Sequence, residues 1–498
     1  MAAMSGVLRL RLVAALGCCW AAAACLADAP NAPSSALKRA PPAVSGVAVA
    51  PNPENVLSKV VRFAATDADS ARVVYWADSD SAATPYYRLA GGQGRIALLG
   101  LRPHTAYAGA VEVVGSGGGG RSEAAAFRSD SLPPGLETVR LTPSGPPGSG
   151  YLLTAVTRDT DAFAVAFDWT GAVCWYRRFP ARPGEIAIGS AQQPNGDFSV
   201  FVGASTGWEP VNGRYYDFRP EGDLVSSYTA GAPYYTDPHE LVLAAAGTPA
   251  ERVLLFGYDL RRVDLTPLGG QADQLVAGHT IVRELPSEGG GTVEFLWSAW
   301  DNFSVADWVA LPPNLPQLTS VDFDHPNSLE IDRDGNYIVS FANLTEVTKI
   351  DAVTGQIIWR LGGRHNQFTF VGDPLGGFGI QHDVRLLDNG DLLLYDNGTF
   401  HTPPQSRAVQ YRLDTSRMTA TLVWEYRHTP AVFTPFVGSV QRYRDGNTLI
   451  GFGAAGLMTD VAPGGQVVWE ARLTVAGQAR TLFYRVRRVP SLYRYERR

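Results

Sequence analysis

The chain has 498 residues, 45% hydrophobic content and a formal charge of -6, so it can bury a large core and shows no basic stripe or charged tail that would bind nucleic acid. Its 52 Gly and 34 Pro, with 21 Phe, 20 Tyr and 11 Trp, favour many short strands joined by tight turns. These numbers exclude a disordered chain and predict an all-β protein with no nucleic-acid partner.

The first 24 residues are typical of an export signal. Arg9 and Arg11 precede an apolar run over residues 12–24 that is too short for a stop-transfer helix. The run ends at Cys25, in a sequence that is similar to a bacterial lipoprotein cleavage box. We therefore expect residues 1–24 to be a signal peptide and Cys25 to be a candidate site for a lipid anchor. The mature protein is then exported, either periplasmic or membrane-anchored and facing the periplasm or the exterior.

Two segments precede the repetitive part of the chain. Residues 25–42 are rich in Ala, Pro and Ser, which predicts a linker. Residues 43–132 contain short alternating apolar segments that predict a small β-sandwich, and the stretch from Leu99 to Tyr107 resembles a turn of fibronectin III-like sandwiches. This predicted domain has no recognisable catalytic set, and formation of a homodimer is one role left open for it.

A repeat over residues 133–498 decides the predicted fold. An Asn-Gly or Asp-Gly turn before a strand recurs at Gly196, Gly335, Gly390 and Gly446, and strands ending in Trp recur between these turns. A spacing of roughly 40 to 60 residues is the period of a propeller blade. We expect a six-bladed β-propeller that forms the catalytic domain, with blades beginning near residues 151, 190, 239, 325, 382 and 438.

Three histidines share one position in this repeat. His239 lies eight residues before Gly247, His382 eight before Gly390, and His325 ten before Gly335. The position is near the start of the innermost strand, where side chains of different blades converge on the central channel of a propeller. These three are therefore the candidate catalytic residues. The other five histidines, His104, His279, His365, His401 and His428, lack this register and are expected to be ordinary.

Three imidazoles in one pocket fit two kinds of chemistry. Neutral imidazole can attack an electrophilic sulfur or phosphorus, while imidazolium can donate to anionic oxygens or to a leaving oxygen. Alternatively, three imidazoles with an open fourth position make a zinc site of the hydrolytic kind. The spacing does not separate group transfer from a metal-dependent hydrolase. Glu240, Asp324 and Asp383 stand next to the histidines, either as residues that orient imidazoles or as turn residues.

Longer segments around these histidines resemble the bacterial arylsulfate sulfotransferase (arylsulfotransferase) family. They are His325-Pro-Asn-Ser-Leu-Glu-Ile-Asp332, the stretch from Lys349 through Trp359 to Gly363, and Gln381-His-Asp-Val-Arg-Leu-Leu-Asp-Asn-Gly390. The similarity covers most of residues 135–490. It implies a six-bladed propeller that moves a sulfuryl group from an aryl sulfate donor to a phenolic acceptor without a nucleotide sulfate donor.

The resemblance also implies roles for single residues. His382 matches the nucleophile that becomes a transient sulfohistidine in a ping-pong mechanism. His325, with Asn327 in the same motif, matches the group that binds the sulfuryl oxygens, and His239 matches the remaining active-site histidine. We expect His239 and His325 to donate to the sulfuryl oxygens. No cofactor and no metal are implied, and the partners are a small aryl sulfate and a phenol.

One position departs from the family pattern. The family arginine should follow the strand over residues 338–341, and this chain has Ala342 there. A missing guanidinium removes an oxyanion clamp worth on the order of a few kcal/mol. Arg407 and Arg360 are the candidates to replace it in substrate binding. The departure favours an alternative in which the propeller binds an anionic aromatic ligand or a surface partner without turnover.

Overall fold

The computed structural model describes residues 40–494 except 79, 159, 205–212, 247, 286–290, 309–320 and 479–480. The predicted signal peptide, Cys25 and most of the predicted linker lie outside the described residues. Within the described part, no helix has the length and apolar character needed to cross a membrane. The described strands all belong to one compact unit, Pro41–Arg498.

The N-terminal strands form two antiparallel sheets around one core. Val61, Val73, Leu98 and Val111 from both sheets are buried in one hydrophobic cluster, as the alternating pattern requires. The fibronectin III-like identity and the boundary at residue 132 stay predictions. One sheet contains β1 (Ala43–Pro51), β2 (Lys59–Thr66) and β6 (Gln93–Leu98), and the other contains β3 (Ser70–Ala77), β4 (Asp80–Ala83), β5 (Tyr87–Arg88), β7 (Ala106–Gly115), β8 (Gly118–Arg121) and β9 (Ala125–Arg128).

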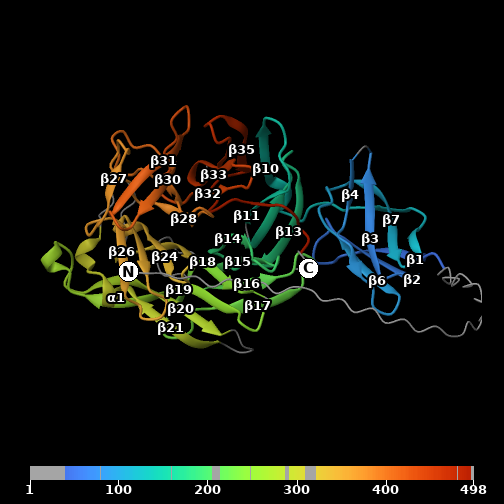
Figure 1. Ribbon diagram of the computed structural model, residues 1–498, viewed down its shortest axis with the longest axis horizontal. Helices are drawn as coiled ribbons and strands as arrows, with labels where there is room; N and C mark the ends of the chain where they lie inside the picture. Colours follow the sequence, from blue (N-terminus) through green and yellow to red (C-terminus); the bar gives the residue numbers. More distant parts are fainter. Residues whose placement is uncertain are drawn as a thin grey trace, which may run out of the picture. The chain divides into compact units, whose positions relative to one another are not determined.

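Six further antiparallel sheets follow in the described residues (Figure 1). The first three contain β11 (Tyr151–Arg158), β12 (Asp161–Phe167) and β13 (Val173–Pro180); then β14 (Glu185–Gln192), β15 (Phe198–Ala204), β16 (Gly213–Phe218) and β17 (Leu224–Tyr228); then β18 (Tyr235–Ala244), β19 (Arg252–Val263), β20 (Gln274–Leu285) and β21 (Thr292–Ser298), with β22 (Val321–Asp322) paired to β20. A single turn of helix, α1 (Ala299–Asn302), follows β21.

In the last three sheets, four strands follow one another in antiparallel order, and the short strand β27 (Thr369–Val371) adds a parallel pair at the outer edge of one of them. These sheets contain β23 (Pro326–Ile331), β24 (Tyr337–Phe341), β25 (Glu346–Ile350) and β26 (Ile357–Gly362); then β28 (His382–Leu386), β29 (Leu392–Asp396), β30 (Arg407–Asp414) and β31 (Thr419–Arg427), with β27 on β31; then β32 (Ser439–Arg442), β33 (Thr448–Phe452), β34 (Leu457–Val461) and β35 (Val467–Val475). The predicted turns join the first two strands of a sheet, and Gly390 has the positive φ of 88° that such a turn needs.

Apolar side chains fill the space between neighbouring sheets. Leu361 of β26, Val384 of β28 and Leu394 of β29 belong to one fully buried cluster that joins two successive sheets. The first strands β14, β18, β23, β28 and β32 also lie next to one another in turn. Sheets stacked through their faces, with their first strands innermost, have the propeller-like arrangement that the repeat predicts.

The two ends of the repetitive part close this arrangement. The C-terminal strand β36 (Arg487–Val489) pairs with β11 and supplies the innermost strand of the first sheet. Strand β10 (Val139–Ser144) pairs with β35 on the outer edge of the last sheet. The residues just before β36 are thereby placed beside the first strands of the other sheets.

Candidate active site

The structure brings the three register histidines to one place. His239 lies in β18, His325 directly before β23, and His382 is the first residue of β28. The rings of His239 and His325 have centroids 4.6 Å apart. The ring of Tyr484, which precedes β36, lies 5.4 Å from that of His239 and 6.5 Å from that of His382. Three successive sheets and the C-terminal segment therefore meet around Tyr484.

The hydrogen bonds of His382 assign its tautomer. The Asn397 amide donates from Nδ2 to the carbonyl oxygens of Thr434 and Val437, at 2.7 and 2.9 Å, so its Oδ1 faces the imidazole. That oxygen accepts from Nδ1 of His382 at 2.8 Å, which places the proton on Nδ1. Nε2 then has a lone pair, and it accepts the backbone N–H of Val437 at 3.3 Å.

His382 is also kept neutral. Burial lowers the pKa of this imidazole to about 3, and nearby His325 and His239 act in the same direction. No carboxylate contacts its ring among the described residues, in contrast to the two other register histidines. A neutral imidazole with a defined Nε2 lone pair can act as a nucleophile at ordinary pH.

His239 and His325 are each held by an aspartate at Nδ1. The Asp237 carboxylate lies 3.0 Å from Nδ1 of His239, and Asp322 Oδ2 lies 2.5 Å from Nδ1 of His325. Burial lowers the pKa of His239 more than Asp237 raises it. Burial also acts against the proton of His325, but Asp322 outweighs it and raises the pKa of His325 above its usual value. The ring of His239 therefore favours the neutral form and the ring of His325 the protonated form, although each contacts an aspartate at Nδ1.

A fourth histidine that the register missed lies in the same cluster. His279, on β20, is 1% exposed, and its Nδ1 lies 2.8 Å from Asp324 Oδ1. Its ring centroid is 6.4 Å from that of His325. Register could not find it because β20 is the third strand of its sheet. The sequence does contain a sign that histidines and aspartates form a cluster here. An aspartate lies two residues before His239, at Asp237, and three residues before His325, at Asp322.

The metal alternative can be compared with this geometry. Within the described residues, the one group of three whose ligand atoms all lie within 4.8 Å of one another is His279, Asp322 and Asp324. Nδ1 of His279 already pairs with Asp324, and Asp322 pairs with His325. The described atoms of His239, His325 and His382 form no such group. The arrangement does not favour the three-histidine zinc site left open above.

The predicted binding residues have different surroundings. Asn327 is fully buried on β23 and donates from Nδ2 to the carbonyl oxygen of Gln381 at 2.7 Å, which ties β23 to the residue before His382. Its Oδ1 has no hydrogen-bond partner among the described residues. Ala342 is also fully buried, and its N–H donates to the carbonyl oxygen of His325 at 3.0 Å. The departure from the family pattern therefore lies next to the backbone of His325.

The structure does not bring Arg407 or Arg360 to the histidines. Arg407 is completely buried, and its guanidinium contacts the carboxylates of Asp373, Asp396 and Glu425 at 2.8 to 2.9 Å. Arg360 lies on β26, the fourth strand of its sheet, and pairs with Glu346 at 2.7 Å. Each guanidinium group contacts at least one carboxylate, and both strands lie farther out than the first strands that carry the histidines.

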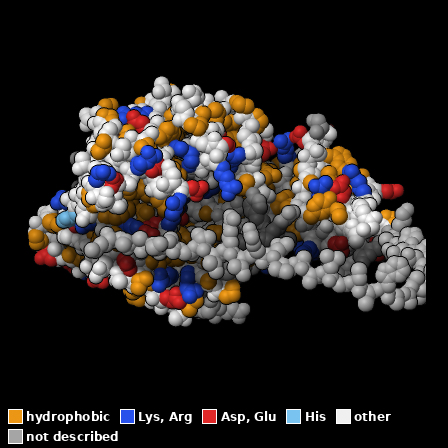
Figure 2. Space-filling model, viewed as in Figure 1, with side chains coloured by type: hydrophobic (Ala, Val, Ile, Leu, Met, Phe, Trp, Pro, Cys, Tyr) orange, Lys and Arg blue, Asp and Glu red, His pale blue; other side chains and the backbone are white. Residues whose placement is uncertain are grey.

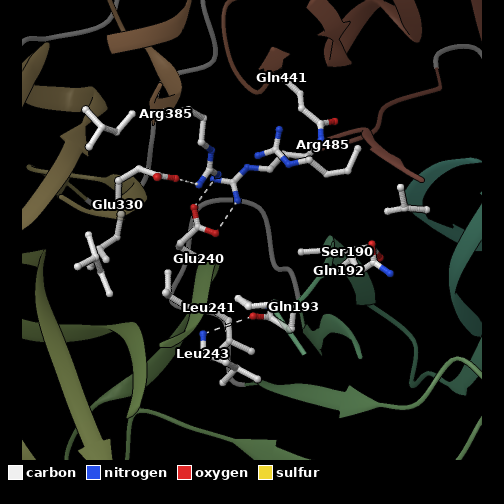
Figure 3. A pocket seen from close by; sticks show the side chains of 18 of the residues that line it. Ser190, Gln192, Gln193, Glu240, Leu241, Leu243, Glu330, Arg385, Gln441 and Arg485 are labelled. Atoms are coloured by element: carbon white, nitrogen blue, oxygen red, sulfur yellow. Dashed lines mark hydrogen bonds and ion pairs between the residues drawn. The ribbon is translucent and has the colours of Figure 1, made fainter. Parts of the chain in front are cut away.

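A layer of arginines and carboxylates follows the histidines along the innermost strands, and Arg385, Arg485, Glu240 and Glu330 of this layer are drawn in Figure 3. Arg385 contacts Glu240 at 2.8 Å, Glu330 at 2.7 Å and Asp383 at 2.6 Å, and Arg485 contacts Glu240 at 3.0 Å. Glu240 and Asp383, which follow His239 and His382, thus pair with arginines and not with imidazoles in the ion pairs of the described residues. Asp324, in contrast, contacts His279. Beyond this layer is a cavity of about 850 Å³ lined by all six innermost strands.

The surface carries charges of both signs. On the face seen in Figure 2, Lys and Arg side chains are interspersed with Asp and Glu, and hydrophobic side chains lie between them. This face shows no broad area of a single charge.

Comparison with known proteins identifies the family. The family model described as arylsulfotransferase (ASST) matches residues 214–474, slightly more than half of the chain. The chain belongs to the arylsulfotransferase family. The matched part of this arylsulfotransferase-family chain runs from β16 to β35 and includes His239, His279, His325 and His382.

Other comparisons add little. No curated protein matches the sequence. A protein of unknown function from Bacteroides caccae is similar over 68% of this chain and 98% of its own, at 14% identity and a TM-score of 0.42. A streptogramin B lyase is similar over 68% of this chain and 88% of its own, at 10% identity and a TM-score of 0.35. A virginiamycin B lyase from Staphylococcus aureus is similar over 68% of this chain and 99% of its own, at 9% identity and a TM-score of 0.32. We draw no argument from likenesses at these values.

Proposed function

We propose that this protein is an aryl sulfate sulfotransferase that moves a sulfuryl group to a phenol by a ping-pong mechanism through His382. Family membership supports arylsulfotransferase activity. The observation that carries the mechanism is the tautomer of His382: Asn397 holds the proton at Nδ1, so Nε2 carries the lone pair, in a cluster where the ring of Tyr484 lies against both His382 and His239.

The first step transfers the group from the donor to the enzyme. Nε2 of His382 attacks sulfur, an S–N bond forms, and the bond from sulfur to the aryl oxygen breaks. The electron pair leaves with the aryl oxide, which takes its proton from water. Protonated His325 supports this step, because Asp322 holds its ring at Nδ1 and an imidazolium can donate a hydrogen bond to a sulfuryl oxygen. In the sulfohistidine, the Nε2 contact with Val437 is replaced by the S–N bond.

The second step returns the group to a phenol. The acceptor oxygen attacks sulfur, the S–N bond breaks, and its electron pair returns to Nε2 of His382. The acceptor also loses a proton, and we assign it to His239. The family resemblance implies a donor role for His239, but the lowered pKa of His239 favours a neutral ring whose one proton is on Nδ1, toward Asp237. Its Nε2 is then a base and not a donor.

Finer features of the chain belong to the same proposal. We take the six sheets to be the blades of a six-bladed propeller that forms the catalytic domain, preceded by a fibronectin III-like sandwich. We also propose that residues 1–24 direct export, with Cys25 as the candidate lipid anchor. The proposed partners are an aryl sulfate and a phenol, with no cofactor.

A binding protein without turnover is the second candidate, and Ala342 favours it. The position after β24 touches the backbone of His325, and here it carries a methyl group where the family pattern has a guanidinium. An aromatic anion could then bind among the imidazoles without transfer.

The deciding experiment measures release of 4-nitrophenol from 4-nitrophenyl sulfate, with and without added phenol, by the mature protein. The variant is His382→Ala, and the control is His428→Ala, a buried histidine that pairs with Glu470 on another sheet. We expect release that phenol stimulates, unchanged in the control and reduced roughly a thousand-fold or more in His382→Ala. Donor alone should leave a sulfuryl adduct that mass spectrometry detects on His382. Folded protein that binds the donor but neither releases nitrophenol nor forms the adduct would establish the binding protein instead.

A further inference from the structure

His279 lies among the aspartates that hold the two other histidines. Its Nδ1 is 2.8 Å from Asp324 Oδ1 and 3.8 Å from Asp322 Oδ1, and its Nε2 is 3.4 Å from Asp237 Oδ2. Asp237 is the partner of His239, and Asp322 is the partner of His325. One imidazole ring therefore lies between both of the pairs that orient the proposed base and the proposed donor.

We propose that His279 is a positioning residue of this site, whose positively charged ring holds Asp237, Asp322 and Asp324 together and so fixes the orientation of His239 and His325. The role rests on the proposed sulfuryl transfer, because His279 acts through residues assigned to that reaction. It is not itself proposed to touch the substrate.

The charge balance of the cluster supports this role. Asp237 and Asp324 are fully buried and Asp322 is 4% exposed. In the described part of the chain, the ion-pair partners of these three carboxylates are histidines alone, with no Lys or Arg among them. Buried carboxylates are costly unless a cation and hydrogen bonds compensate them. His279 is the histidine that reaches all three.

The ring of His279 is held on several sides. Its own backbone N–H donates to Asp324 Oδ2 at 3.2 Å, so Asp324 binds the residue at two points. The ring of Tyr258 lies 4.4 Å from it on the neighbouring strand β19. The ionisable groups that face it are thus Asp237 and His239 from β18, Tyr258 from β19, Asp322 from β22, and Asp324 and His325 from the segment before β23. Burial acts against its charge, but the aspartates raise the pKa of His279 well above the usual value.

A charged His279 also affects the protonation of its neighbours. Burial is the main cause that lowers the pKa of His239, and His279 adds to it. At His325, burial and His279 both act against the pKa increase that Asp322 causes. Removing the positive charge while keeping the shape should therefore raise the pKa of both histidines, which a residue that only fills space would not do.

The test is His279→Gln, with His428→Gln as the matched control, since His428 is also buried and also pairs with a carboxylate. The pKa values of the His239 and His325 rings are measured by NMR titration of the ring nitrogens, without substrate. We expect both to rise in His279→Gln and neither to change in the control. The kcat/KM for 4-nitrophenyl sulfate should fall roughly 10- to 100-fold, as it does when residues that orient metal-bound histidines are lost, and its alkaline limb should move to higher pH.

Two outcomes overturn the role of His279. One is that the pKa values of the His239 and His325 rings are unchanged in folded His279→Gln. The other, where the wild-type protein is an active enzyme, is that the kcat/KM profile of His279→Gln equals that of the wild type. If the wild type shows no sulfuryl transfer, the proposed function fails, while the NMR titration still tests the positioning. If His279→Gln does not fold, Asp324→Asn keeps the ring and removes its closest partner. The pKa of His279 should then fall, and a value equal to that of the wild type would contradict the proposal.

Discussion

Asp322 decides over which pH range His325 keeps its proton. The imidazole is 7% exposed, and burial alone would make it lose the proton easily. The Asp322 oxygen 2.5 Å from Nδ1 reverses this and raises the pKa of His325. Since the proposed donor is the protonated form, transfer should persist at neutral pH and fall as the pH rises through the raised pKa. The stability that this pair contributes has the same sign: it is present below the usual histidine pKa and is lost as the pH rises through the raised one.

Asp322→Asn should therefore move the alkaline limb of the pH profile to lower pH. Without the carboxylate, the main effect that opposes burial is lost and the pKa of His325 falls. We expect kcat/KM for an aryl sulfate to decrease roughly 10-fold or more at neutral pH and to recover in part on acidification, measured by nitrophenol release across the pH range. The control is Asp334→Asn, an exposed carboxylate near Lys349 on the same sheet. An unshifted alkaline limb in Asp322→Asn would show that protonated His325 is not needed.

At the scale of elements, buried charges join the innermost strands. Asp383, on β28, accepts from Arg385 of its own strand, from Arg487 of β36 and from the backbone N–H of Val440 on β32. Burial would raise the pKa of this carboxyl, but Arg385, Arg487 and Arg485 hold it far below its usual range. Its backbone has a φ of 55°, a left-handed conformation that Asn tolerates well. Strands far apart in the sequence thus depend on one carboxylate.

Asp383→Asn should destabilise the protein by about 3–5 kcal/mol, because three guanidinium groups lose their shared buried partner. Urea unfolding at neutral pH measures the effect. Asp273→Asn is the control: Asp273 is 76% exposed beside Arg262, and we expect its loss to change the unfolding midpoint little. A midpoint for Asp383→Asn equal to that of the wild type would mean that these strands are held by apolar packing alone.

In the molecule as a whole, pairing between strands from the two ends of its repetitive part closes the ring of sheets. The strand β36 comes from the end of the chain and pairs with β11, more than 300 residues earlier. Val489 of β36 is 2% exposed and packs in one cluster with Leu153 and Trp175 of the first sheet. Closure also brings Tyr484 and Arg485 to the other innermost strands. The geometry of the site and the stability of the fold therefore both depend on the pairing of β36 with β11.

Val489→Asp should weaken the whole ring and not one sheet. A charge at this buried position has no partner, and we expect a loss of about 4 kcal/mol or more. Tryptophan fluorescence and far-UV circular dichroism should report the same lowered urea midpoint. Val353→Asp is the control, since Val353 is 87% exposed. Separate transitions in the two signals would indicate that the sheets unfold independently of closure.

The strand pattern and the positions of three histidines follow from local sequence signals. The Asn-Gly and Asp-Gly turns are local signals, because only a few neighbouring residues set the positive φ that they need. Each turn sets the register of its sheet, so residues that precede it by a similar number, such as His325 before Gly335 and His382 before Gly390, fall at the start of equivalent first strands. That part of the site could be predicted without coordinates.

The other residues that contact these histidines come from distant parts of the chain and depend on how the sheets pack. Asn397 reaches His382 from the loop after β29, His279 from a third strand, and Tyr484 from the segment that closes the ring. Arg485 contacts Glu240 across 245 positions, while Arg407, a candidate on sequence grounds, is enclosed by carboxylates. Such contacts leave no periodic signal, because they arise from ring closure and from the balance of buried charges, and both depend on sheets distant in the chain.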